Sequence, residues 1–404
     1  MQFNSCVKRI WFKPSGIFTA VSCLLLQPAY AETGFEEWKQ QQQSSVQQSK
    51  DAFTAYKAEI QASFKEYSRK TSAVWGKDNV DPNRKNWVSY IDQLNQRSVV
   101  DFEKGTVDVE IALPAGQSID DKEGKKKLEN ILLKAMNLGD DKRSIKNVAE
   151  QPVSQPQGGA VLRGQISLPD GDVANPDDYK KIARESANGA SKKTLRGKDG
   201  KKRIVYTAQL KLVPDHIRIR ARKYQPLVNK YSEKHKVPAP VVFAVIETES
   251  MFNPTARSGA PAFGLMQLVP TSGARDAYRY LYKKDRIVTD TYLYDPENNI
   301  RLGSVYLYRL NSEYLGGIKS DKSRMLATIA AYNTGPSNVF RAFVGKYSRS
   351  RFGSYSRYKA AALREINSRS PEQVYQQLRQ RLPYSETREY VKKVTERMGK
   401  YTTS

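Results

Sequence analysis

The sequence predicts an α+β domain followed by an all-α domain. Segments that alternate apolar and polar residues, as half-buried strands do, are confined to the first half of the chain. Helical periodicity prevails from about Tyr224 onward. The length of 404 residues fits two to three domains of about 100–200 residues each. We expect the first domain over residues 32–213 and the second over residues 224–404.

A leader segment precedes both domains. Residues 1–31 begin with a positively charged region, carried by Lys8, Arg9 and Lys13. The apolar stretch at 16–26 is too short to span a bilayer comfortably, and Ala29-Tyr30-Ala31 fits a signal-peptide cleavage site. The pattern predicts a secretory signal peptide that is removed before Glu32. The alternatives are an uncleaved anchor and a lipoprotein acylated on Cys23, although Leu24 continues the apolar run beyond that cysteine.

Composition excludes several classes of protein. Lys and Arg number 67 against 42 Asp and Glu, which gives a net charge of +25. Aromatic residues make up 10% of the chain, too many for a disordered protein. Cys6 and Cys23 both lie in the leader, so a disulfide scaffold is excluded. In an exported protein, this charge favours anionic lipid or a carboxylate-bearing cell wall over nucleic acid as partner.

The first domain shows mixed elements. Residues 36–75 carry apolar residues at three- and four-residue spacing, which predicts a long amphipathic helix packed on a sheet. Residues 99–103 and 106–113 alternate around Lys104-Gly105 and predict a β-hairpin. We also expect a helix at 125–136, a basic loop or turn at 191–203 and a strand at 203–212. No group of residues here is typical of catalysis, so binding or positioning is the expected role.

The second domain is expected to consist of helices. Prolines at first-turn positions mark several helix starts. The expected helices cover 224–235, begin at Pro240 and at Asp295-Pro296, and cover 324–332 and 371–380.

The helix that begins at Pro240 carries the candidate for chemistry. At 100° per residue, Glu249 continues the apolar stripe of Val242 and Val245. Glu247 points about 140° away from Val242 and is expected to be an ordinary surface carboxylate. A glutamate on a buried face needs a partner or a raised pKa, and a general acid needs a raised pKa to work near neutral pH. The alternative is a stripe that ends at the surface, with Glu249 solvated.

Four sequence blocks then occur in order. They are Glu249-Ser250-Met251-Phe252-Asn253-Pro254, Gly264-Leu265-Met266-Gln267, Ala331-Tyr332-Asn333-Thr334-Gly335-Pro336 and Ser385-Glu386-Thr387-Arg388-Glu389-Tyr390-Val391. With these blocks the second domain resembles the lytic murein transglycosylases of the soluble type (SLT), which share the goose-type lysozyme fold. The first domain is similar to the partner domain of the membrane-bound transglycosylases of type C. The resemblance implies an all-α, goose-lysozyme-like catalytic domain behind the α+β accessory domain.

The resemblance also implies a reaction. In the family, the glutamate of the first block, here Glu249, is the only catalytic carboxylate. It protonates the glycosidic oxygen between N-acetylmuramic acid and N-acetylglucosamine, and then takes the proton of the muramyl 6-hydroxyl, which closes a 1,6-anhydro ring. The implied partner is the peptidoglycan glycan strand, in the periplasm or at the outer membrane. No cofactor or metal is expected, since His216 and His235 are the only histidines and have no ligand-type spacing to carboxylates.

The other blocks supply the implied substrate contacts. Each residue also has an ordinary structural explanation: a turn glycine, a helix C-terminus or a solvated helix face. By resemblance, the substrate-binding residues are Ser258, Gly264, Gln267, Tyr332, Asn333, Glu386 and Tyr390.

The chain departs from the family pattern at two places. Phe263 stands where the family often has a small or polar residue. Residues 346–364 form an extra basic stretch in which aromatic rings alternate with arginines and lysines. These residues can grip glycan and peptide carboxylates, but a solvated loop is the favoured interpretation.

Three alternatives to a lytic transglycosylase stay open from the sequence. A muramidase on the same fold would use water, and its product would be heavier by one water. A non-catalytic peptidoglycan-binding protein would not need Glu249. An exported nucleic-acid-binding protein would be supported by net charge alone and would bind DNA in a salt-sensitive way.

Overall fold

The computed structural model describes residues 29–117, 120–139, 142–143, 145–150, 160–258 and 261–402. Most of the predicted signal peptide, with both cysteines, lies outside these residues. The chain divides into two compact units, Met1–Thr54 and Ala55–Ser404. The described part of the first unit is the beginning of helix α1 (Ala29–Trp75). The predicted division between residues 213 and 224 therefore falls within one unit and stays a prediction.

The α+β part is built on an antiparallel sheet of five strands in the order β1-β2-β3-β5-β4. The strands are β1 (Asn86–Ile91), β2 (Gln96–Asp101), β3 (Thr106–Ala112), β4 (Ser191–Arg196) and β5 (Lys202–Lys211). The predicted hairpin is confirmed, because β2 pairs with β3 and Gly105 takes a positive φ of 67° in the turn. The predicted strand at 203–212 is confirmed as β5.

Strand β4 shows where one sequence expectation is wrong. Residues 191–203 were expected to form a loop or turn, but Ser191–Arg196 pairs with β5 at the sheet edge. Five of its six residues are exposed, and only Leu195 is buried. An edge strand with such a surface lacks the apolar alternation that makes strands recognisable, and edge lysines discourage pairing with other chains.

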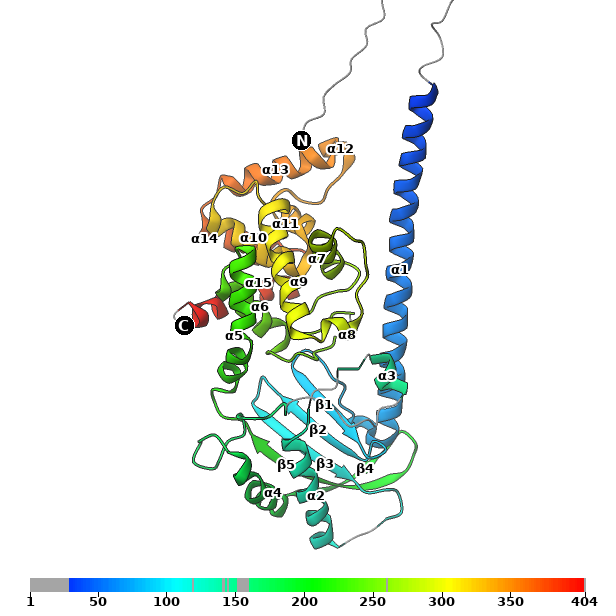
Figure 1. Ribbon diagram of the computed structural model, residues 1–404, viewed down its shortest axis with the longest axis vertical. Helices are drawn as coiled ribbons and strands as arrows, with labels where there is room; N and C mark the ends of the chain where they lie inside the picture. Colours follow the sequence, from blue (N-terminus) through cyan, green and yellow to red (C-terminus); the bar gives the residue numbers. More distant parts are fainter. Residues whose placement is uncertain are drawn as a thin grey trace, which may run out of the picture. The chain divides into compact units, whose positions relative to one another are not determined.

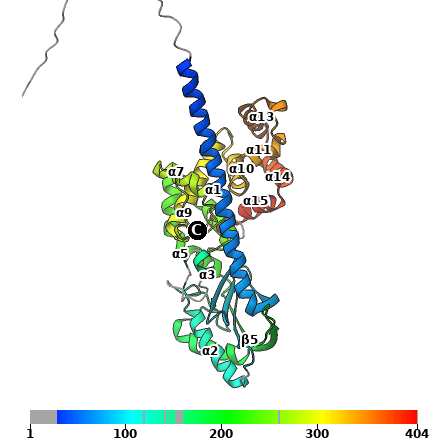
Figure 2. The same ribbon diagram turned by 90° about the vertical axis from the view of Figure 1, so that its right-hand side faces the viewer.

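Helices cover both faces of this sheet. Helices α2 (Asp121–Met136) and α4 (Tyr179–Asn188) pack on each other and on one face, over a core that includes Val100, Val107 and Leu128 (Figures 1 and 2). The end of α1 covers the other face, where the ring of Tyr67 meets Tyr90 at 6.0 Å between centroids. The predicted packing of a long helix on the sheet is confirmed for this end of α1.

A buried ion pair lies beneath the end of α1. Arg97 of β2 and Glu110 of β3 form a salt bridge, and both side chains are about 5% exposed. The Arg97 guanidinium lies 4.0 Å from the ring centroid of Trp75, whose indole N–H donates to the Leu94 carbonyl at 2.7 Å. The pair joins β2 and β3, where Arg97 and Glu110 lie directly opposite each other, and removal of either charge would leave the other buried without its partner.

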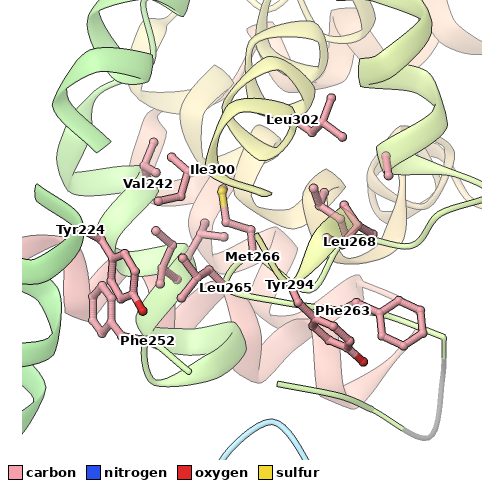
Figure 3. Packing of buried hydrophobic residues seen from close by; sticks show 14 of the residues in the cluster. Tyr224, Val242, Phe252, Phe263, Leu265, Met266, Leu268, Tyr294, Ile300 and Leu302 are labelled. Atoms are coloured by element: carbon pink, nitrogen blue, oxygen red, sulfur yellow. The ribbon is translucent and has the colours of Figure 1, made fainter. Parts of the chain in front are cut away.

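The remaining elements are helical, as predicted for the second half of the chain, whereas α3 in the first half was not predicted. Their bounds are α3 (Ile145–Glu150), α5 (His216–His235), α6 (Ala239–Ser250), α7 (Gly273–Tyr282), α8 (Asp290–Leu293), α9 (Pro296–Arg309), α10 (Asp321–Thr334), α11 (Pro336–Val344), α12 (Arg349–Phe352), α13 (Tyr355–Asn367), α14 (Pro371–Arg381) and α15 (Ser385–Met398). Figure 3 shows the core in which α5, α6 and α9 meet the segment that contains Leu265 and Met266.

Residues 346–364 depart from the favoured interpretation as a solvated loop. Most of this stretch forms α12 and α13, each capped by a serine, Ser348 or Ser354, that accepts a backbone N–H. Tyr358 is only 2% exposed and anchors the segment to the core beside Phe340. Tyr358 and Ala362 are the buried apolar residues among the described residues of this stretch, too few to show an apolar stripe among its charges.

No helix in the described part of the chain is both long enough and apolar enough to cross a membrane.

Candidate active site

Helix α6 delivers Glu249 to the wall of a cavity. Pro240 lies in the first turn of this helix, where a missing N–H costs nothing, and its middle residues from Val241 to Ile246 are buried. Glu249 follows in the last turn and is only 5% exposed. The prediction that Glu249 continues the buried face is confirmed.

The turn after Glu249 is held by a buried arginine. Met251 and Phe252 both take positive φ angles, 50° and 59°, which are costly for these residues. Arg220 of α5 donates to their carbonyl oxygens at 3.0 and 2.8 Å, and its guanidinium lies 3.6 Å from the ring centroid of Phe102 in the α+β part. Arg220 therefore fixes the end of α6 against the sheet domain, a role that no sequence pattern indicated.

A second turn faces Glu249 and contains the Gly264-Leu265-Met266-Gln267 block. Asn299 of α9, fully buried, organises it: its amide donates to the carbonyls of Phe263 and Leu293, and its oxygen accepts the Met266 N–H at 2.8 Å. Gly264 has φ 77°, and a Cβ there would lie 2.3 Å from the Asn299 amide nitrogen. Glycine is thus required by packing against Asn299, and Gly264 is not among the residues that line the cavity.

The cavity has a volume of about 1140 Å³. It brings together six of the predicted site residues, namely Glu249, Ser258, Gln267, Tyr332, Asn333 and Glu386. The Gln267 NH₂ group donates to the carbonyls of Ala256 and Gly264. Its buried Oε1 has no hydrogen-bond partner among the described residues, so Oε1 is the group that remains to bind a ligand. Tyr390 is 4% exposed and does not line the cavity.

The surroundings of Glu249 keep its carboxyl protonated up to neutral pH. Burial raises its pKa from the ordinary 4.5 to about 7, against the opposing effects of the Arg84 guanidinium and the Tyr390 hydroxyl. Arg84 Nη1 lies 3.4 Å from Glu249 Oε2, a long contact for an ion pair. The Tyr390 hydroxyl is buried and makes no direct hydrogen bond of ordinary geometry among the described residues.

Arg84 is a site residue that the sequence did not reveal. It lies in the α+β part, just before β1, with Asn83 and Lys85, which also line the cavity. The Asn83 side chain accepts the Lys85 N–H at 2.8 Å, and Lys85 pairs with Glu103 at 2.5 Å, so this loop is ordered. Arg84 Nη2 also donates to Glu386 Oε1 at 2.9 Å. The α+β part therefore contributes a charged side chain to the site.

The last two blocks meet across the cavity. The Tyr332 hydroxyl donates to the Met266 carbonyl at 2.8 Å, which ties the end of α10 to the turn that contains Gln267. Asn333 Oδ1 accepts the hydroxyl of Thr387 at 2.7 Å, so its amide NH₂ group is left for other partners. Burial, with the nearby charge of Glu249, raises the pKa of Tyr332 well above its ordinary value, so this hydroxyl stays a donor.

Glu247 corrects the expectation of a surface carboxylate. It is only 2% exposed. Its oxygens accept the Lys400 ammonium at 2.8 Å and the Tyr401 hydroxyl at 2.7 Å, and Arg397 lies at 3.2 Å. The C-terminal end of the chain packs on this face of α6, which no periodicity within α6 could show.

The histidines and carboxylates offer no metal site within the described residues, where no cluster of three or more His, Cys, Asp or Glu side chains was found. His216 and His235 are both buried, and burial lowers their pKa values. Neither lines the cavity.

Comparison with known proteins matches both halves of the chain. The transglycosylase SLT domain matches residues 226–352, and the N-terminal domain of membrane-bound lytic murein transglycosylase C matches residues 53–223. Membrane-bound lytic murein transglycosylase C of Klebsiella pneumoniae subsp. pneumoniae is 34% identical over 83% of this chain and 87% of that protein. The chain belongs to the membrane-bound lytic murein transglycosylase C family.

A second protein of the same name agrees with this membership in the transglycosylase C family. The protein of the same name in Salmonella arizonae is 33% identical over 83% of this chain and 87% of its own length. The 70 kDa soluble lytic transglycosylase of Escherichia coli shows 28% identity and a TM-score of 0.31 over 47% of this chain and 26% of that chain. The predicted resemblance and enzyme class are confirmed, and this member of the transglycosylase C family is a lytic murein transglycosylase.

Proposed function

We propose that this enzyme cleaves the β-1,4 bond between N-acetylmuramic acid and N-acetylglucosamine in peptidoglycan without water and leaves a 1,6-anhydro muramyl end. One observation carries the proposal: Glu249 is buried at the wall of a large cavity and has a pKa of about 7. A carboxyl group of this kind donates and accepts protons with similar ease near neutral pH, as a single acid and base must.

The proton balance needs only Glu249. Its carboxyl proton goes to the glycosidic oxygen as the bond from C1 of the muramyl residue to that oxygen breaks, and the N-acetylglucosamine end leaves as an alcohol. The muramyl 6-hydroxyl then attacks C1 and gives its proton to the Glu249 carboxylate. The O6–C1 bond closes the anhydro ring, Glu249 is protonated again and no water is consumed.

Arg84 and Tyr390 would stabilise the intermediate in which Glu249 is ionised. Arg84 Nη1 lies 3.4 Å from Glu249 Oε2. The buried Tyr390 hydroxyl also lowers the pKa of the Glu249 carboxyl, which favours its ionised form. The charge that develops on Glu249 therefore meets a cation and a dipole already in place, which is how preorganised sites lower a barrier.

A second carboxylate lines the cavity but has a different environment. The Glu386 side chain is 67% exposed and is paired with Arg84, whereas the Glu249 side chain is buried. Two-carboxylate glycosidases need a second group as nucleophile or as base for water. Arg84 holds Glu386 at the cavity wall, and we infer that Glu386 contacts the substrate there. The other proposed contacts line the same cavity and are Ser258, Gln267, Tyr332 and Asn333. Gly264 and Tyr390 would act on the substrate indirectly, through the turn and through Glu249.

Digestion of purified murein sacculi tests this proposal. We expect muropeptides with anhydro ends, lighter by one water than those of a muramidase, and release by Glu249→Gln that is slower by about 10²- to 10⁴-fold. Glu386→Gln is expected to leave the anhydro product unchanged while it weakens substrate binding. Hydrated reducing ends as the main product, or full turnover by Glu249→Gln, would overturn the assignment.

We also propose that the mature protein acts in the periplasm, in association with the outer membrane. The support is the signal-peptide pattern of residues 1–31 and the names of the relatives, which describe membrane-bound enzymes. Mass spectrometry of the mature N-terminus decides its form. A mature chain that starts at Glu32 would support signal-peptide cleavage before Glu32. A mature chain that starts at an acylated Cys23 would instead show that the protein is a lipoprotein.

A further inference from the structure

A second surface, at residues 346–364, is both basic and aromatic. This stretch, in orange in Figure 1 and formed largely by α12 and α13, contains no Asp or Glu. We call it the aromatic–basic platform. Its six cations are Lys346, Arg349, Arg351, Arg357, Lys359 and Arg364. No ion pair between described residues involves any of the six, so their charge is not neutralised within the described part of the protein.

The rings of the platform are held in a fixed arrangement. Buried Tyr358 lies at its centre, with the ring centroids of Phe352, Tyr347 and Tyr355 at 5.0, 5.5 and 5.7 Å. Tyr347 and Tyr355 are nevertheless 37% and 45% exposed. Rigid tyrosines with one face in solvent offer contact area at little cost in conformational entropy, which suits them to bind sugars and peptides.

The platform begins next to the cavity. Asn338 of α11 lines the cavity, and the neighbouring Ser337 hydroxyl is hydrogen-bonded to the Tyr355 hydroxyl at 2.7 Å. Tyr355 therefore lies close to the part of the cavity wall that Asn338 forms. Tyr355 thus contacts the neighbour of a cavity-lining residue, although 16 residues lie between Asn338 and Tyr355 in the sequence.

We propose that the aromatic–basic platform binds the part of a murein strand that leaves the cavity, with the tyrosines packed against the strand and the cations paired with stem-peptide carboxylates. The inference rests on the proposed function, which makes murein the substrate. Murein chemistry fits the platform because its stem peptides carry several carboxylates, for which arginine is the best-matched side chain. The proximity of the platform to the cavity favours the polymer that occupies this cavity over a lipid surface.

Sedimentation with purified sacculi tests the platform. The full protein carries Glu249→Gln so that the sacculi stay intact, and binding is scored before any fragments are released. Arg349→Gln, Arg351→Gln and Arg357→Gln together are expected to weaken binding about tenfold, because each exposed ion pair that is lost contributes only modestly to affinity. The matched control removes three exposed cations of α4, by Lys180→Gln, Lys181→Gln and Arg184→Gln, and is expected to bind as the parent does.

Two further arms identify the ligand. When the carboxylates of the sacculi have been amidated, the parent and the triple arginine variant of the platform are expected to bind equally. Vesicles of phosphatidylglycerol and phosphatidylethanolamine are expected not to distinguish parent from variant. Equal losses in the platform and α4 variants would overturn the proposal, as would a loss confined to vesicles, which would assign the platform to a membrane.

A ring variant separates the platform from the reaction. Tyr355→Ala, with circular dichroism to confirm the fold, is expected to weaken binding to sacculi and to leave the anhydro product unchanged when glycan fragments without peptides are digested. Unchanged binding by Tyr355→Ala would contradict the role of the rings. Release of murein by Glu249→Gln at the parent's rate would instead contradict the proposed function. Binding to the platform would still be measured in that case, because the sacculi are sedimented before fragments are released.

Discussion

The two sides of helix α6 each bury one glutamate, and the two glutamates meet different surroundings. Glu247 faces the C-terminal end of the chain, where a lysine, an arginine and a tyrosine hydroxyl all lie within 3.2 Å of its carboxylate oxygens. Glu249 faces a cavity, with a single guanidinium at 3.4 Å. Burial alone therefore does not make a carboxyl group an acid for catalysis. The number of donors that satisfy its charge decides between a structural and a catalytic role.

The largest expected effect comes from removing the cavity-facing carboxyl. Glu249→Gln should lower the rate of murein cleavage by about 10²- to 10⁴-fold, the range that a positioned acid or base contributes. The far-ultraviolet circular dichroism should stay that of the parent. Turnover within a few-fold of the parent would place the chemistry elsewhere.

Glu247→Gln should have the opposite pattern. It leaves Arg397, whose side chain is only 16% exposed, without its charged partner, so we expect a loss of about 3 kcal/mol in the free energy of unfolding. Activity per folded molecule should change little. Urea denaturation measures the first quantity and murein turnover at low temperature the second. A stable Glu247→Gln enzyme with lost activity would reverse the two roles.

The pH dependence of stability sharpens the contrast. The pKa of Glu249 is higher in the folded protein, about 7, than its ordinary value of 4.5, so its protonated form stabilises the fold at low pH. That contribution disappears as the pH rises through 7. At about pH 8 Glu249→Gln should unfold with a free energy higher than the parent's by up to about 3 kcal/mol, at about 1.4 kcal/mol per unit of pKa.

At about pH 4 the same two proteins should have nearly equal stability, because Glu249 is protonated in both the folded and the unfolded state. Chemical denaturation at the two pH values gives the comparison. If the difference in the free energy of unfolding between the two proteins does not depend on pH, burial does not raise the pKa of Glu249.

The smallest effect is expected at Arg84. Arg84→Gln removes the cation that lowers the pKa of Glu249, so the alkaline limb of kcat/KM should move to higher pH. Lys85→Gln is the matched control, since Lys85 also lines the cavity but pairs with Glu103 instead. An unchanged limb in Arg84→Gln, or an equal shift in both variants, would remove Arg84 from the site.

The sequence predicted the elements whose signal is local. The Thr106–Ala112 strand and the Glu249 stripe follow from periodicity within one segment. The four blocks located eight of the 17 residues that line the cavity. The surroundings of Glu247 were missed because Arg397, Lys400 and Tyr401 lie about 150 residues further along the chain. Asn299 and Arg220 position turns through single buried hydrogen-bonding side chains, which leave no pattern in composition or periodicity.

The contribution of the α+β part was equally invisible in the sequence. Arg84 is one of 67 Lys and Arg residues, and it precedes β1, a strand that the sequence did not predict. Only its distances to Glu249 and Glu386 single it out. Strand β4 was missed because five of its residues are exposed, so the pattern that identifies strands was absent.

The protonation state of Glu249 is the centre of the account, and it can be measured directly. Carbon-13 NMR titration of the side-chain carboxyl groups, with Glu249→Gln to assign the resonance, gives its pKa in the intact protein. We expect a midpoint near 7 and a higher one in Arg84→Gln. A midpoint near the ordinary glutamate value of about 4.3 would show an ionised carboxylate at neutral pH and would contradict the single-acid mechanism.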